Sequence, residues 1–216
     1  MLGIVITVYG RYNHTSICFE SVENLWLPEG TKIVIVDDGT RDKRCVDLIN
    51  GFKPQNAKVF VIRNDSNIGV ARSLQVGLDY AVELECDLLM NLDNDTTVKP
   101  DAVNVITKLH QRYQGAVVSG FNTMSRDSKT NRVRHPIIYA AGDHVRKKSI
   151  GGINMMFSKQ VYKDFVRPSL LKNRRHWDWQ VCATGIELYA TVPSVVQHTG
   201  INGGMNMNNP DIAHDY

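Results

Sequence analysis

Short apolar runs rich in β-branched residues alternate with stretches of helical spacing four times within about the first hundred residues of this chain. The run from Leu2 to Val8, for example, is followed by Ile17, Val22 and Leu25, which fall close to one helical face. Strands are expected at 2–8, 32–36, 59–62 and 88–92, and helices at 12–26, 45–52, 70–84 and 101–113. This alternation predicts an α/β fold with a mostly parallel central sheet flanked by helices.

The pattern changes after Gly115. Residues 122–148 are polar, basic and without helical periodicity, which favours loops or antiparallel strands. Further strands are expected at 116–120, 151–157, 186–192 and 194–196, and a short helix at 159–165. We expect a single domain over residues 1–200, with a first half at about 1–115, a second half at about 116–200, and a flexible C-terminal tail at 201–216.

The composition argues against a membrane span and against a disulfide framework. No apolar run approaches the roughly 18–20 residues that cross a bilayer, and residues 1–9 lack a basic leader and a cleavage site. The cysteines are scattered without paired spacing, which is typical of buried thiols. These features favour a cytoplasmic protein or a soluble piece of a longer chain.

Positive charge is concentrated in residues 126–175. That segment has 13 Lys or Arg and three Asp, a net charge of +10, so the rest of the chain carries −7 of the total of +3. The segment is either a solvated, loop-rich face or a surface that meets an anionic partner.

Polar clusters follow each expected strand of the first half, at residues 7–9, 37–40, 63–67 and 93–95. Ligands of open α/β sheets bind outside the carboxyl ends of the strands, where these clusters should meet. Asp93 and Asp95 are two positions apart, so in extended chain their carboxylates face the same side. Such a pair suits a hard divalent cation, although Asp and Asn also form ordinary turns.

The ordered set of motifs resembles the family-2-type nucleotide-sugar glycosyltransferases of the GT-A fold. The resemblance spans roughly residues 2–200. It rests on Thr7 and Tyr9, Val36-Asp37-Asp38-Gly39-Thr40, Asn67-Ile68-Gly69-Val70-Ala71-Arg72 with Gly77, Asp93-Asn94-Asp95, Gly151-Gly152, Trp177-Asp178-Trp179, Pro193 and His198. It implies a nucleotide-binding half, an acceptor-side half and a small antiparallel sheet on the acceptor side.

The resemblance also implies an activity, namely a metal-dependent, inverting hexosyltransferase (EC 2.4 type). The donor would be a nucleotide-diphosphate sugar of the UDP type, and the acceptor a hydroxyl of a glycan, lipid or protein. Mn²⁺ or Mg²⁺ would be held by Asp93, Asp95 and His198. Nucleotide contacts would come from Thr7, Tyr9, Asp37, Asp38, Asn67, Arg72 and Asp93, with Tyr9 stacking on the base and Arg72 near the phosphates.

Asp178 is the expected base, because apolar neighbours raise a carboxyl pKa toward the working pH. Trp177 and Trp179 could form a platform for a sugar, and Gly151 and Gly152 let backbone approach the acceptor or sugar. The chain departs from the family here: the usual Glu-Asp pair is replaced by Trp177-Asp178. This leaves the family's two acids unmatched, and a helix N-cap is the structural alternative for Asp178.

Four other interpretations remain open. The basic segment also suits a phosphate backbone, as in a DNA glycosyltransferase that extrudes a hydroxylated base. An anionic membrane is a further possible partner. A nucleotidyltransferase would share the sheet and the acidic site, but Gly10-Arg11-Tyr12 is a poor version of the Gly-rich loop such enzymes use. Finally, the acids could be turn formers in a non-catalytic sugar-binding module.

Overall fold

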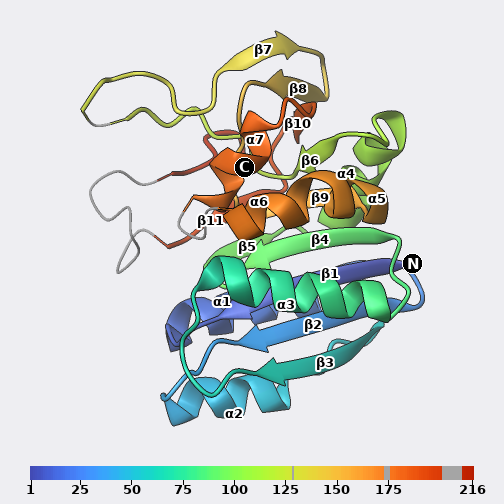
Figure 1. The fold of residues 1–216 in the computed structure, drawn as a ribbon, viewed down its shortest axis with the longest axis vertical. Coiled ribbons are helices and arrows are strands. Elements are labelled where there is room, and N and C mark those ends of the chain that lie inside the picture. The colour runs from blue at the N-terminus through green and yellow to red at the C-terminus, as the bar shows by residue number, and fades with distance from the viewer. Residues whose placement is uncertain (128, 173–175, 201–210) are drawn as a thin grey trace.

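The computed structural model describes residues 1–127, 129–172, 176–200 and 211–216. Strands and helices alternate through its first half as the sequence predicts (Figure 1). The elements are β1 (Leu2–Val8), α1 (Tyr12–Glu23), β2 (Thr31–Asp37), α2 (Lys43–Gly51), β3 (Ala57–Arg63), α3 (Val70–Glu83), β4 (Leu88–Asp93), β5 (Thr96–Val98) and α4 (Ala102–Arg112). Each observed boundary lies within a few residues of the expected one, except that the short strand β5 was not expected.

One mixed sheet of nine strands runs through the molecule, in the order β3-β2-β1-β4-β9-β6-β10-β8-β7. Its later strands are β6 (Val117–Ser119), β7 (Ile137–Ala140), β8 (His144–Lys147), β9 (Asn154–Ser158) and β10 (Leu188–Thr191). β3, β2, β1 and β4 are parallel, and β9 pairs antiparallel with β4. Figure 1 shows the parallel strands together at one end of the molecule and β7 and β8 at the other.

Helical structure in the second half extends beyond the short helix expected at 159–165. It consists of α5 (Lys159–Val161), the π-helical turn η1 (Tyr162–Val166), α6 (Arg167–Lys172) and α7 (Trp177–Ala183). The apolar side chains of Val161, Val166 and Leu170 are at most 5% exposed. Because these side chains pack under the sheet, the segment stays helical past the range in which the sequence pattern was clear.

The core has two layers, one on each face of the sheet. Successive residues of a strand point to opposite faces, so Ile4 and Ile6 pack with α1, α2 and α4, whereas Val5 packs with α3, α6 and α7. Strands buried on both faces explain the nearly continuous apolar runs of β1 and β2.

A second sheet of two strands lies at the carboxyl end of β4. It pairs β5 antiparallel with β11 (Val196–His198), and Thr96 lies opposite His198. This is the small antiparallel sheet that accompanies the main sheet, and it joins parts of the chain about a hundred residues apart. The expected α/β architecture is therefore confirmed.

The last described residues, 211–216, are bonded to the domain. Ala213 is 4% exposed and exchanges two hydrogen bonds with the Gln197 side chain, at 2.8 and 2.9 Å. The flexible tail expected at 201–216 stays a prediction, and its residues 201–210 lie outside the described part of the chain. Among the helices described, none is both long and apolar enough to cross a membrane.

Candidate active site

A cleft of about 900 Å³ opens at the carboxyl ends of the parallel strands. Most residues singled out from the sequence line it: Thr7, Tyr9, Asp38, Asn67, Asp93, Asp95, Gly151, Gly152, Trp177, Asp178, Trp179 and His198. Asp37 and Arg72 are not among the described residues that line it. The cleft therefore joins the expected nucleotide, metal and acceptor residues in one space.

The β5–β11 pairing brings Asp95 and His198 together. His198 Nε2 lies 3.3 Å from Asp95 Oδ2. The other ring nitrogen, Nδ1, is 3.1 Å from the backbone oxygen of Asp211, so Nε2 is the nitrogen that faces the carboxylate. Gly200 completes this corner, because a Cβ there would collide with both Asp95 and His198.

The pKa values of Asp93 and Asp95 are shifted in opposite directions. Withdrawal from solvent, followed by the charge of Asp95, raises the pKa of Asp93 to about 8. Burial also opposes ionisation of Asp95, but its bonds to His198 and Arg11 outweigh that effect and lower its pKa. The two carboxyl groups of the motif therefore differ in environment: Asp95 has two cationic partners in direct contact, whereas burial dominates at Asp93.

A divalent cation fits this donor set. Within the described residues, no three His, Cys, Asp or Glu side chains form a complete metal centre, but Asp95 and His198 meet and Asp93 lines the same cleft. Small divalent cations commonly use one or two carboxylates and take their other ligands from water and substrate phosphates. Burial and the charge of Asp95 raise the pKa of Asp93 although His198 and Arg11 oppose the shift, and a divalent cation bound beside it would favour its ionised form.

At the end of the cleft where a nucleotide is expected, Asp38 organises a loop. Its Oδ1 accepts hydrogen bonds from Asn64 Nδ2 at 2.9 Å and from the Ile68 N–H at 2.8 Å, and its Oδ2 accepts from the Gly69 N–H at 3.0 Å. These bonds fix the turn before α3 and set the floor of the cleft. Tyr9, which is 56% exposed, stands at the mouth.

Asp37 serves the fold elsewhere. Its carboxylate is fully buried, accepts from the Thr40 N–H at 2.9 Å and pairs with Arg63 Nε at 2.8 Å. Of the two adjacent acids, only Asp38 reaches the cleft. Strand alternation explains the difference, because neighbouring residues point to opposite sides.

Asp178 lies in the first turn of α7 and lines the cleft. Its Oδ2 accepts a hydrogen bond from the Gly152 N–H at 3.3 Å, and its Oδ1 accepts from the Trp179 N–H at 2.9 Å. Burial raises its pKa above the ordinary value of 3.8. Trp177 is 5% exposed and covers Gly152, whereas Trp179 is 45% exposed and faces the cleft.

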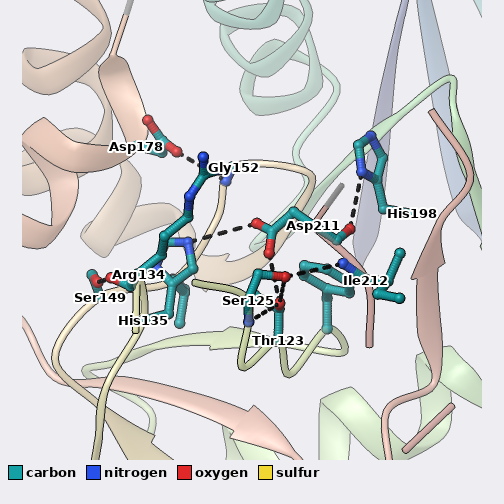
Figure 2. A network of polar contacts seen from close by, with 12 residues as sticks. Thr123, Ser125, Arg134, His135, Ser149, Gly152, Asp178, His198, Asp211 and Ile212 are labelled. Atoms are coloured by element: carbon teal, nitrogen blue, oxygen red, sulfur yellow. Dashed lines mark hydrogen bonds and ion pairs between the residues drawn. The ribbon is translucent and has the colours of Figure 1, made fainter. Parts of the chain in front are cut away.

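Among the cleft residues that the sequence analysis did not propose as site residues are Arg11, His135 and Asp211. Figure 2 shows the contacts that connect the last two with His198. His135 Nδ1 is 3.0 Å from Ser149 Oγ, and its Nε2 is 3.7 Å from Asp211 Oδ2. Its ring stacks on Trp179 with centroids 5.5 Å apart. No local motif marks these residues, because only the tertiary fold brings them together.

Burial makes His135 a neutral side chain. It is 4% exposed, and burial lowers its pKa to about 4 although Asp211 opposes the shift. The positive charge on this wall of the cleft therefore comes from Arg132 and Arg134, which also line it.

The chain matches the family model described as "Glycosyl transferase family 2" over residues 3–175. The match covers well over half of the chain, which therefore belongs to this family. A curated relative, "N-acetylglucosaminyltransferase" from Rhizobium meliloti (strain 1021), is 23% identical over 115 residues, which is 53% of this chain and 26% of the relative. The chain thus spans only about a quarter of the length of that relative.

Solved glycosyltransferase structures share the fold. S. aureus TarS 1–349 in complex with UDP-GlcNAc is 10% identical, with a TM-score of 0.61, over 88% of this chain and 55% of that chain. GalNAc-T7 with UDP, GalNAc and Mn²⁺ is 14% identical, with a TM-score of 0.65, over 92% of this chain and 43% of that one. These likenesses confirm the expected GT-A fold.

Proposed function

We propose that this member of glycosyl transferase family 2 transfers a hexose from a UDP-sugar to an acceptor hydroxyl, with inversion and with a divalent cation. The observation that carries the proposal is the cleft itself, since Asp95, His198 and Asp178 line one space together with the nucleotide-end residues. UDP-GlcNAc in TarS and UDP with Mn²⁺ in GalNAc-T7 support this choice of donor and metal.

The donor would lie with its nucleotide near Thr7, Tyr9 and Asn67. Tyr9 is exposed enough to stack on the base, and Asp38 holds the loop that carries Asn67. Asp95, His198 and Asp93 would hold Mn²⁺ or Mg²⁺, which when bound neutralises charge on the departing diphosphate. Asp37 and Arg72 have no part in this scheme, because neither lines the cleft.

Asp178 would act as the base. The acceptor oxygen attacks the anomeric carbon as the bond from that carbon to the phosphate oxygen breaks, and the hydroxyl proton passes to the Asp178 carboxylate. A single displacement of this kind inverts the anomeric centre. The bond from Gly152 orients the carboxylate, and Trp177 packs against Gly152 beside it. A raised pKa makes Asp178 a stronger base than an exposed aspartate.

The acceptor would enter between Gly151, Gly152 and Trp179. A hydroxyl of a glycan, lipid or protein suits this opening better than duplex DNA. Many cations of residues 126–175 have partners away from the cleft: Lys159 pairs with Asp87 and Arg167 with Asp79, each at 2.8 Å. Within the described residues, the segment therefore offers the cleft two arginines, Arg132 and Arg134, rather than a continuous track for a phosphate backbone.

A thermal-shift experiment tests the proposal. The melting temperature should rise with UDP and Mn²⁺ together, and much less with either alone, because the cation and the diphosphate bind as a unit. Asp95→Ala should remove this rise, whereas Asp47→Ala, which changes an exposed carboxylate on α2, should keep it. A wild-type protein that shows no joint effect would contradict the proposal. Hydrolysis of a panel of nucleotide sugars would then identify the donor.

A further inference from the structure

Arg11 forms an ion pair with the same carboxylate oxygen of Asp95 that a metal ion would bind. Its Nη1 lies 2.5 Å from Asp95 Oδ2, and His198 Nε2 lies 3.3 Å from that same oxygen. Both members of the pair are largely shielded, with side-chain exposures of 25% for Arg11 and 11% for Asp95. Such a pair is stronger than an exposed salt bridge, because solvent screens it less.

The backbone aims Arg11 at this position. Gly10 and Arg11 both have positive φ, 62° and 57°, in the turn between β1 and α1. A left-handed conformation is uncommon outside glycine and is maintained only where the surroundings fix it. Here the Gly10 N–H donates to Thr40 Oγ1 at 2.9 Å, and the Gly10 oxygen accepts from Thr15 Oγ1 at 3.0 Å.

The same turn is tied directly to the acidic motif. Asn94, the residue between the two acids, donates through Nδ2 to Thr15 Oγ1 at 2.7 Å. Arg11 and Asp95 are therefore held in register by a chain of hydrogen bonds, from Gly10 through Thr15 to Asn94. The local backbone and its hydrogen bonds therefore hold the Arg11–Asp95 ion pair in place.

A guanidinium cannot relieve competition by losing its proton, because arginine stays charged in proteins. A cation that takes Asp95 Oδ2 must therefore move the Arg11 side chain. In the proposed reaction the cation arrives with a diphosphate, and guanidinium binds phosphate oxygens through parallel hydrogen bonds. The diphosphate thus offers Arg11 a new anionic partner in the same cleft when the cation binds Asp95.

We propose that Arg11 is a donor-binding residue that exchanges partners: it holds Asp95 in the unloaded protein and binds the donor diphosphate when the cation takes Asp95. This inference rests on the proposed function and adds an ordering to it. Metal alone binds against competition from Arg11, whereas metal and nucleotide together release the arginine to a better partner. Binding of the two should therefore be cooperative.

Binding measurements on Arg11→Gln test the exchange. Electron paramagnetic resonance of free Mn²⁺ should show Mn²⁺ alone bound about tenfold tighter than in the wild type, because the competing charge is gone. Calorimetry at saturating Mn²⁺ should show UDP bound about tenfold weaker, because a phosphate contact is lost. Arg11→Lys, which keeps the charge, should lie closer to the wild type in both measurements.

Arg112→Gln is the matched control. Arg112 pairs with Asp143 at the same 2.5 Å separation, outside the cleft, so its loss should change neither affinity. Unchanged or weaker Mn²⁺ binding in Arg11→Gln would overturn the exchange, and so would unchanged UDP affinity. Failure of the proposed function is a separate result, since the wild type would then show no Mn²⁺-dependent UDP binding at all.

Discussion

The backbone N–H of Gly152 donates a hydrogen bond to Asp178 Oδ2 across 3.3 Å, which joins the entry to β9 with the first turn of α7. The approach is close because residue 152 has no side chain: a Cβ there would lie 2.8 Å from Trp177 Cζ2 and 3.1 Å from Asp178 Cβ. The candidate base and the tryptophan beside it are therefore positioned by a glycine.

Gly152→Ala should destabilise the protein and displace Asp178. Overpacking of this kind costs on the order of 1–3 kcal/mol, and each kcal/mol lowers the melting temperature by about 2–4 °C in a domain of this size. Gly151→Ala is the control, because its Cβ would meet nothing nearer than 3.8 Å. Equal losses of melting temperature in the two variants would contradict the proposed close contact.

Asp178→Asn should lower the rate of sugar transfer by about 10²–10⁴-fold, because the amide cannot take the acceptor proton. Affinity for UDP with Mn²⁺ should stay at the wild-type level, since Asp178 lies on the acceptor side. The control is Asp164→Asn, an exposed carboxylate on η1. Near wild-type transfer by Asp178→Asn, measured at saturating donor, would exclude Asp178 as the base.

The wild-type rate should also depend on pH in a defined direction. Burial raises the pKa of Asp178 above 3.8, and only the ionised carboxylate accepts a proton. Transfer should therefore increase as pH rises through that pKa. The profile of kcat/KM against pH checks this, and a rate that falls over the same acidic range would contradict a carboxylate base.

Gly200→Ala should abolish the joint effect of UDP and Mn²⁺ on the melting temperature, because the added Cβ collides with Asp95 Oδ2 and His198 Nε2. Gly115→Ala provides the comparison: its Cβ would have no neighbour within 4 Å and its φ is not positive. A normal joint effect in Gly200→Ala would show that Asp95 and His198 do not form the cation site.

His135 should make the fold sensitive to acid. Burial lowers its pKa from 6.5 to about 4, so the folded state favours the neutral ring. The resulting stability is fully present above pH 6.5 and is lost as pH falls toward about 4, on the order of 1–3 kcal/mol. As pH falls over that range, the melting temperature of His135→Gln should decrease less than that of the wild type. His214→Gln, at an exposed histidine, should follow the wild type.

The alternating pattern was sufficient to predict the elements from β1 to α4 except the short strand β5, because strands and helices buried on fixed faces leave clear periodicities. It could not predict that β9 enters the sheet antiparallel between β4 and β6, since pairing partners depend on tertiary packing rather than on local sequence. The helical extent of residues 159–172 was underestimated for a related reason. A helix that packs against several neighbours has apolar residues on more than one face, so its sequence does not show the simple helical periodicity of apolar residues.

Residues that line the cleft were predictable where polar side chains follow a strand end, as at Asp93 and Asp95. The two acids at 37 and 38 were indistinguishable in sequence, and only strand orientation separates the structural Asp37 from the cleft residue Asp38. The sequence analysis named Arg11 only as part of a poor glycine-rich loop. Its ion pair with Asp95 depends on a left-handed backbone conformation that no sequence motif predicts.

The pairing of Thr96 with His198 has a consequence for how the protein matures. A contact between segments this far apart in sequence closes late, after the local elements have formed, because loop closure carries an entropic cost. A partly folded chain can thus assemble its nucleotide half while the imidazole is still absent from the acidic corner. Cation binding at the proposed Asp95–His198 site is then expected only of the finished fold, and its appearance during refolding would mark completion of the domain.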